Sequence, residues 1–568
     1  MDRAELRQRA DRRFELMLED RRDWEPWWRE LSRQFAPWRG RFRVGEEPKK
    51  GPLRKNSRPC QIPDDFAAGI KSGLTSPSRP WFTLTLYDNR LAENERVKAW
   101  LTKVQDVMQG QMIRTNLYDQ IYDVYKEQGI FGTGALFIEE DDEDVFRATC
   151  MTVGSWCIGL DRRGKVCRFG RDMARTGAQL AEEFGEEALP EAIRAALRER
   201  PTNTRYELRN LIEPDEEGER PWRSLWWLKG YDEPAFLRVS GYWEMPVMVP
   251  RWRVVGGDVY GREQPGDVAL DDAKTLQELE ADERAAIKKG VRPPVTIPTD
   301  TVQGALQDWP GGVTVYTPIQ DRPVIAPLYQ VQFDHQSAAA KRLELTAHIE
   351  EAFYVNFFRM WTTDQRQGRT ATEIEAREAE KMYMLGPLIE RQQSEMLDPL
   401  IARVFGIMDR RGMFPPPPEE LSGEDMKIEY TSILASIQKQ TAQAGIDIVL
   451  ERTGQIMQIQ GAAGERPSIL DKIDFDEVVD QLADMYALPA GVVLGDDVVE
   501  QVRAEREAAE AQAQAQAQMM QEAQAMAQAA PQVSGAARDM AETPLPGGED
   551  MLSAMAGMIG GAEDGTEA

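Results

Sequence analysis

A charged helix, a segment rich in proline and glycine, and a second helix follow one another between residues 267 and 359, and this succession restricts the fold more than any other feature. The first helix, VALDDAKTLQELEADERAAIKKG, is amphipathic, with Asp267 as its expected N-cap and Gly290 as its end. The next residues, VRPPVTIPTDTVQGALQDWPGGVTVYTP, hold short β-prone runs and leave no room for a helix. The second helix spans roughly Val331–Arg359. This order predicts a long hairpin with a small β-like tip that projects from the body of the protein.

A tryptophan-rich helix is predicted near the N-terminus. Its apolar residues recur at i, i+3, i+4, i+7 and i+11, which places them on one face: Trp24, Trp27, Trp28, Leu31 and Phe35. The helix is expected to end before Pro37. Tryptophans at this spacing are typical of core or interface anchors, so we expect this face to dock against another element.

The segments that follow alternate between helices and strands. The first such segment is a short helix, followed by a turn rich in serine and proline at Thr75–Pro80 and a strand at Trp81–Leu86. The second has the same order, with a helix that ends at Gly129 and a strand at Ala135–Ile138. Further strands are expected around Trp156–Gly159, Trp226–Tyr231, Tyr242–Met245 and Val247–Trp252. Residues 1–260 are therefore predicted to form a mixed α+β body.

After the hairpin the sequence becomes helical again. Thr370 and Glu373 form a capping box at the start of an amphipathic helix, behind a polar loop at Thr362–Arg369. The run FPPPPEE marks a boundary, and further helices follow between residues 428 and 500. Residues 500–530 are rich in alanine and glutamine and favour a solvated helix, whereas the Gly-, Ala- and acid-rich residues 531–568 are expected to be disordered.

Charge limits the classes of partner. The 568 residues carry a net charge of −27, distributed unevenly: residues 1–60 have 17 basic and 11 acidic side chains, and residues 471–568 have 4 and 20. Because phosphate binding is driven by lysine and arginine, this net charge argues against a protein that grips nucleic acid over its whole surface. A protein past which nucleic acid slides without sticking is compatible with this charge.

The cysteines and the N-terminus indicate a soluble, intracellular protein. No C-x-x-C pair occurs among the four cysteines, which argues against a zinc ribbon or a thioredoxin-like motif: Cys60, Cys150, Cys157 and Cys167. Their scarcity fits a reducing compartment. The charged N-terminus is followed by no secretory apolar region, and no apolar run approaches the length of a membrane span.

No enzyme motif is complete. The stretch VVGGDVYGREQPGD has the glycine spacing of a P-loop, but Arg262 replaces the lysine and Glu263 the hydroxyl residue. His335 and His348 stand 13 residues apart within one amphipathic helix and match no zinc-protease pattern. The acidic run Glu139–Asp144 is expected to be a solvated loop rather than a two-metal site. The sequence therefore predicts no catalytic residue, no metal and no cofactor.

Four segments in a particular order resemble a known family. They are SGLTSPSRPWFTLTL, GIFGTGALFIEED, YGREQPGDVALDDAKTLQELE and GRTATEIEAREAE, with the predicted hairpin between the last two. Together they resemble the head-to-tail connector, or portal, proteins of short-tailed bacteriophages over roughly residues 10–500. The resemblance implies an α+β, mainly helical portal fold of wing, stem, clip and crown. It also implies a ring, commonly of twelve subunits, whose axial channel carries double-stranded DNA into the capsid and out again.

The resemblance assigns a region of the fold to each part of the chain. In order, these are a wing (1–265), a first stem helix (266–290), a clip (291–328), a second stem helix (329–360), a tunnel loop (361–371), a long wing helix (372–420), a crown with a helical extension (421–530) and a disordered acidic tail (531–568). Three groups of residues acquire roles. Arg366, Gln367 and Arg369 face the DNA channel; Gly261, Arg262, Pro265 and Asp267 form the joint between wing and stem; and Pro293, Pro294 and Trp309 of the clip contact terminase or the tail adaptor.

The implied partners are further copies of the chain, the DNA, the terminase large subunit, tail adaptors, and capsid and scaffold proteins, without a membrane. The implied location is the portal vertex of the virion, and the host cytoplasm during assembly. Two other classes stay open on the residues alone. A terminase-like packaging enzyme or a maturation protease would need a complete active site, and an assembly scaffold would suit the acidic Ala/Gln helix but not the large α+β body.

Overall fold

The computed structural model divides the chain into two compact units, Met1–Ala487 and Leu488–Ala568. The second unit is described only for helical residues between 499 and 519. The structure describes residues 2–39, 41–46, 54–86, 88, 91, 94–199, 203–298, 306–316, 326–328, 333–362, 389–421, 426–430, 453, 478–479 and, between 499 and 519, single residues and short runs.

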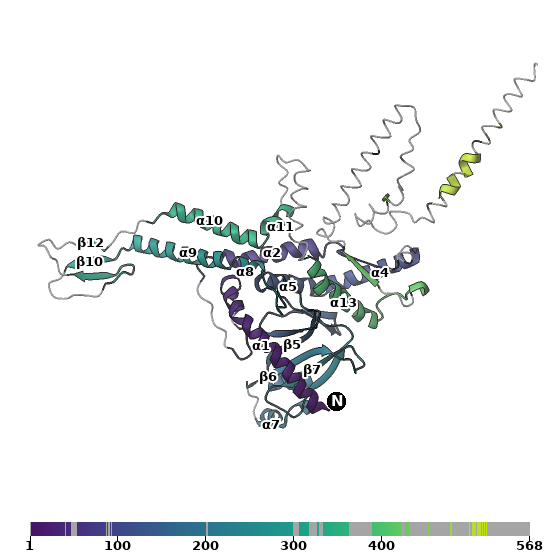
Figure 1. Ribbon diagram of the computed structural model, residues 1–568, viewed down its shortest axis with the longest axis horizontal. Coiled ribbons are helices and arrows are strands. Elements are labelled where there is room, and N and C mark those ends of the chain that lie inside the picture. The colour runs from purple at the N-terminus through teal and green to yellow at the C-terminus, as the bar shows by residue number, and fades with distance from the viewer. Residues whose placement is uncertain are drawn as a thin grey trace, which may run out of the picture. The chain divides into compact units, whose positions relative to one another are not determined.

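The first unit combines long helices with several small sheets (Figure 1). Its helices are α1 (Arg3–Phe35), α2 (Arg58–Leu74), α4 (Glu95–Arg114), α5 (Leu117–Phe131), α6 (Gly177–Phe184), α7 (Glu191–Glu199), α8 (Pro265–Val268), α9 (Leu270–Val291), α10 (His335–Ala352), α11 (Val355–Thr362) and α13 (Asp398–Arg410), with a π-helical turn at Gln393–Leu397 and 3-10 turns at Glu186–Ala188 and Glu419–Leu421. Its strands are β1 (Phe82–Leu86), β2 (Leu136–Asp141), β3 (Val145–Cys150), β4 (Trp156–Leu160), β5 (Val166–Thr176), β6 (Arg205–Pro214), β7 (Trp222–Leu228), β8 (Arg238–Tyr242), β9 (Val247–Met248), β10 (Val295–Pro298), β11 (Val313–Tyr316), β12 (Ala326–Pro327) and β13 (Met426–Tyr430). An α+β, mainly helical fold is thus confirmed.

The N-terminal helix α1 ends at Phe35, as predicted, and buries most of the predicted face. Trp28, Leu31 and Phe35 are fully buried. Trp27 is 42% exposed, so its assignment to the buried face was wrong. The buried stripe follows i, i+3, i+7, and Trp27 lies one position off it, toward solvent.

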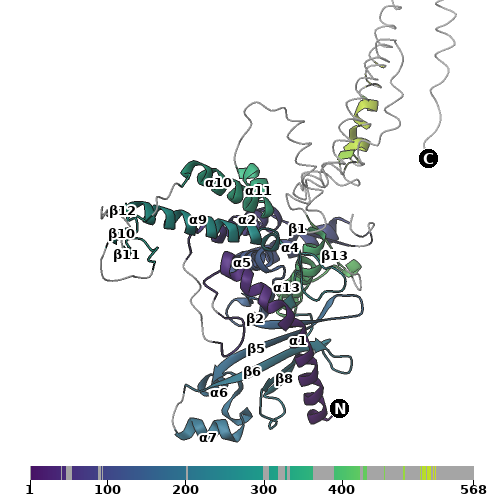
Figure 2. The same ribbon diagram turned by 60° about the vertical axis from the view of Figure 1, so that its left-hand side comes forward.

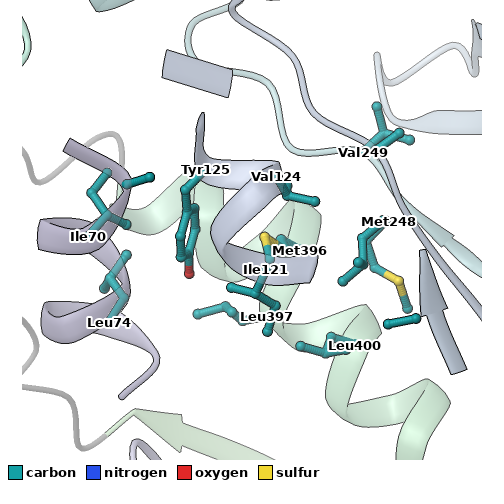
Figure 3. Close-up of a cluster of buried hydrophobic side chains, with 14 of the residues drawn as sticks. Ile70, Leu74, Ile121, Val124, Tyr125, Met248, Val249, Met396, Leu397 and Leu400 are labelled. Carbon is teal, nitrogen blue, oxygen red and sulfur yellow. The ribbon is translucent and has the colours of Figure 1, made fainter. Parts of the chain in front are cut away.

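The main core lies where helices from distant parts of the chain converge. Figure 3 shows Ile70 of α2, Tyr125 of α5 and Leu400 of α13 turned toward a common centre, together with Met248 of β9. Each of these side chains is almost completely buried. Because α2 and α13 are more than 300 residues apart in the chain, this core joins the N-terminal body to the residues that follow the hairpin.

A five-stranded antiparallel sheet, in the order β4-β5-β6-β7-β8, is covered by helices on both faces (Figure 2). Adjacent residues of β7 point to opposite faces, as the strand period requires. Trp227 packs with Phe14 of α1, and Trp226 packs with Leu180 of α6. The N-terminal half of α1 therefore covers one face, and α6 and α7 cover the other.

The predicted hairpin is present. In both views α9 and α10 lie side by side, and the strands β10 and β12 lie at the end away from the body (Figures 1 and 2). Three short strands in the order β11-β10-β12 form the tip. The second helix is shorter than predicted: α10 begins at His335, and Tyr354, with a φ of 55°, separates it from α11.

Three further expectations needed correction. Asp267 lies in the first turn of α8 rather than at an N-cap, because Pro265 begins that helix and Gln264 precedes it. The acidic run is not wholly a loop, since β2 extends to Asp141. The strands expected at Tyr242–Met245 and Val247–Trp252 are β8, which ends at Tyr242, and the two-residue β9.

Candidate functional site

The joint between the body and the hairpin depends on two glycines that lie against each other. Gly132 ends α5 with a φ of 81°, and its carbonyl accepts a hydrogen bond from Trp252 N–H at 2.7 Å. A Cβ on Gly261 would stand 2.1 Å from that same carbonyl oxygen. Thr133 Oγ1 accepts a hydrogen bond from Gly261 N–H at 2.8 Å. Gly261 is therefore required by the close approach of two backbone segments and does not belong to a phosphate-binding loop.

The replacement Gly261→Ala tests this contact. The added methyl group meets backbone rather than a movable side chain, so we expect the free energy of unfolding to fall by about 1–3 kcal/mol. Gly290→Ala is the matched control, since a Cβ there meets nothing within 4 Å. A loss no larger for Gly261→Ala than for Gly290→Ala in urea unfolding would contradict the close approach.

Arg262 is held against the N-terminal helix. Its guanidinium lies 4.5 Å from the ring centre of Trp24 and forms an ion pair with Asp258. Glu263, in place of the P-loop hydroxyl, forms an ion pair with Arg253. Neither Arg262 nor Glu263 is thus arranged for phosphate or magnesium.

The helix start at the joint borders a small pocket. Pro265 occupies the first position of α8, where its missing N–H costs no hydrogen bond. Asp267 accepts a hydrogen bond from the Trp27 side chain, and burial raises the pKa of Asp267. A pocket of about 290 Å³ is lined by Asp23, Trp24, Trp27, Arg262, Gln264 and Asp267. The predicted joint residues are thus neighbours in space.

The two hairpin helices are joined by charge and by a short apolar seam. Arg342 of α10 reaches Glu280 of α9 at 2.9 Å and also forms an ion pair with Glu283. Leu276 and Leu345 are buried on the facing sides. This seam is confined to the part of the hairpin near the body, because none of residues 284–291 of α9 is buried.

The tip of the hairpin has little interior of its own. Pro294 is buried and its carbonyl accepts a hydrogen bond from Leu328 N–H at 2.7 Å. Pro293 is half-buried, and Trp309 is 54% exposed. Within the described part of residues 292–328, only Pro294, Gly312 and Thr314 are buried, and none of them is a large apolar side chain. A three-stranded sheet without an apolar face is not stable alone in water.

The channel residues predicted from the sequence, Arg366, Gln367 and Arg369, lie outside the described residues.

Comparison with known proteins identifies the family. A family model described as "Bacteriophage head to tail connecting protein" matches residues 7–494. The chain belongs to this family. It is 32% identical over 502 residues to the "Probable portal protein" of Bordetella phage BPP-1, and 31% identical over 500 residues to the "Portal protein" of Salmonella phage epsilon15. Each alignment covers 86% of this chain and 88% of the relative.

Among solved structures, a chain from the neck of an empty gene transfer agent particle covers 74% of this chain at 10% identity and a TM-score of 0.29, a value too low to carry an argument. The protein has the role of a head-to-tail connector in a bacteriophage particle, and its family is structural rather than enzymatic.

No group of metal-binding side chains is found among the described residues. Within the same residues, no helix has the length and apolar character needed to cross a membrane.

The connector body is tied together by two buried arginines that the sequence did not single out. The Arg251 side chain meets Glu395 through Nη2 at 2.6 Å and also donates to the Gly164 carbonyl at 2.8 Å. Arg403, fully buried, donates to Glu244 at 2.8 Å and lies 3.7 Å from Glu140. Glu140 belongs to the acidic run, so that run supplies a partly exposed partner to a buried arginine. No sequence motif marks these pairs, because each joins residues more than 140 positions apart.

Proposed function

We propose that the chain is one subunit of a closed ring, of twelve copies, whose axial channel carries double-stranded DNA during packaging and ejection. In this proposal α9 and α10 are the stem, residues 291–328 the clip, and residues 1–265 with 372–420 the wing. Residues 421–530 then form the crown and its extension, and residues 531–568 an acidic tail. Membership of the connector family and likeness to two portal proteins support this role.

The observation that most supports assembly into a ring is the exposed apolar surface of the hairpin. Leu343 of α10 is 73% exposed, Val291 at the end of α9 is 76% exposed, and Ile287 is 46% exposed. Trp309 adds a large exposed ring at the tip. Exposed apolar patches mark contacts with other chains, and a head-to-tail contact that closes on itself forms a ring. Neighbouring subunits would thus supply the interior that the hairpin and its tip lack.

The charge of the hairpin supports passage of DNA rather than tight binding. Helix α9 carries six acidic and four basic side chains, and α10 carries three and two, a net charge of −3. Each phosphate neutralised by lysine or arginine adds affinity, so a channel wall of this composition lets DNA slide. We assign the weak contacts that steady the DNA to Arg366, Gln367 and Arg369 in a loop at the constriction.

The proposal also names the partners. The clip, with Pro293, Pro294 and Trp309, would contact the terminase large subunit during packaging and a tail adaptor afterwards. Capsid and scaffold proteins would surround the wing at one vertex of the virion, after assembly in the host cytoplasm.

Mass measurement tests the ring directly. Twelve chains of 64.3 kDa would give a particle of about 770 kDa in native mass spectrometry. A protein that stays at the mass of one chain at high concentration, or that hydrolyses a nucleoside triphosphate unaided, would instead favour the packaging-enzyme alternative.

Leu343→Glu is expected to raise the subunit concentration at half-assembly about tenfold or more, because a charge would enter an apolar contact between subunits. Leu343→Met keeps the apolar volume and is the matched control, expected to assemble like the unchanged protein. Equal assembly of both variants in sedimentation velocity would show that this face of α10 lies outside the interface.

A further inference from the structure

Two turns of opposite charge lie at the same end of the five-stranded sheet. β4 and β5 pair up to Leu160 opposite Val166, which leaves residues 161–165 as a turn. β6 and β7 pair up to Pro214 opposite Trp222, which leaves residues 215–221 as a second turn. Because β5 pairs with β6 in antiparallel register, both turns lie at one end of the sheet.

The first turn, called here the basic turn (residues 161–165), presents three cations to solvent. Arg162, Arg163 and Lys165 are exposed, and no ion pair involving them is found within the described part of the chain. Its shape is fixed by the Asp161 carboxylate, which accepts hydrogen bonds from Arg163 N–H at 2.7 Å and Lys165 N–H at 2.9 Å. The buried Arg251 holds the turn to the body through the Gly164 carbonyl. The cations are thus displayed on a rigid support.

The second turn, called here the acidic turn (residues 215–221), presents three anions. Glu216, Glu217 and Glu219 are exposed, and they too have no ion pair within the described residues. The one cation of this turn, Arg220, is turned to the Gly241 carbonyl, to which it donates at 2.6 Å. The backbone closes the turn through Asp215 N–H, which donates to the Pro221 carbonyl at 2.9 Å. The Asp215 carboxylate lies 3.4 Å from Arg223 of β7. This turn is therefore also held in place.

The two turns do not neutralise each other within one chain. Their centres are separated by two strand spacings, about 10 Å, and the described residues show no ion pair between them. Each turn keeps three like charges side by side in the free subunit. Such unpaired and complementary groups are typical of surfaces that meet a partner.

We propose that the basic turn of one subunit contacts the acidic turn of the next subunit in the ring. This inference rests on the proposed ring. Rotation about the ring axis does not change the position of an atom along that axis, called here its height. Two different surfaces of the subunit can therefore meet between neighbouring copies only if their heights are similar. Whatever the tilt of the sheet, the heights of the two turns differ by no more than their separation of about 10 Å. Each subunit would give one basic turn and receive one.

Reversal of charge tests the pairing. The triple variant R162E/R163E/K165E and the triple variant E216K/E217K/E219K should each raise the subunit concentration at half-assembly about tenfold, since attraction becomes repulsion at every contact. The chain that carries all six replacements should assemble within about threefold of the unchanged protein, because the pairing is restored with opposite sign.

Control variants separate this contact from general charge effects. R96E/K98E/K103E changes three exposed cations of α4 by the same total charge and should leave assembly within about threefold. Circular dichroism and thermal unfolding should be unchanged in all variants, because every replaced side chain is exposed. Rings that form equally well with either triple reversal, or six replacements that fail to restore assembly, would overturn the pairing and leave the ring intact. An unchanged protein that forms no oligomer at all would overturn both.

Discussion

Replacing Trp28 by alanine is expected to lower the free energy of unfolding by about 3–5 kcal/mol. The Trp28 ring is completely buried and packs edge-on against Tyr260 at 5.0 Å between ring centres. Tyr260 is itself fully buried and precedes Gly261, so the cavity left by Trp28 would open directly beneath the joint. We therefore expect loss of stability and a loosened attachment of the hairpin.

The neighbouring Trp27 provides the matched control. Trp27→Ala removes the same side chain from a position that is 42% exposed and also removes the hydrogen bond to Asp267, so the expected loss is about 1–2 kcal/mol. Urea unfolding followed by far-ultraviolet circular dichroism compares the two directly. Equal losses for Trp27→Ala and Trp28→Ala would contradict the placement of α1 in the core.

Replacing Arg403 by alanine is expected to cost about 2–4 kcal/mol, because it leaves a cavity where a buried side chain packs and takes a hydrogen-bond donor from Glu244. Arg403 is fully buried, donates to Glu244 at 2.8 Å and lies over the ring of Tyr242 at 5.3 Å. Its removal leaves a cavity beside α13, and Glu244 loses the more buried of its two arginine partners. Contact of α13 with Glu244, between β8 and β9, would then depend on Arg410.

Arg410 is the matched control, because it binds the same two carboxylates from the exposed end of α13. Its Nη1 lies 2.7 Å from Glu244 and its Nη2 lies 3.1 Å from Glu140. We expect Arg410→Ala to cost about 1 kcal/mol or less, as exposed ion pairs do. A third variant, Arg403→Met, should recover part of the loss because it refills the space without a charge. Equal destabilisation by Arg410→Ala and Arg403→Ala in the same urea experiment would contradict the different roles of these two arginines.

Local sequence patterns were sufficient for the hairpin and for the N-terminal helix. The helical period of α1 and the run of prolines and glycines between α9 and α10 are signals within a few residues of each other. The helical period could not show that Trp28 is buried and Trp27 exposed, because positions i+3 and i+4 both border an apolar stripe. The strands β5 and β6 were missed, since their charged residues hide the alternation and their pairing joins distant segments.

The joint shows why contacts between distant segments could not be predicted from the sequence. Glycine spacing in the stretch VVGGDVYGREQPGD raised the question of a P-loop, and Arg262 and Glu263 argued against one. The positive reason for Gly261 is the carbonyl of Gly132, which comes from the end of α5. No property of the local sequence records that contact. The same holds for Arg403, whose partners Glu140 and Glu244 are brought to it only by the fold.

In the proposed function, many copies of this chain close around a channel lined by the hairpin. Electron microscopy of the purified full-length protein tests this directly. We expect closed rings with a central hole, in which the α9–α10 hairpin of each subunit stands next to that of its neighbours. Single chains at high concentration, open filaments, or rings whose hairpins point away from the hole would contradict it.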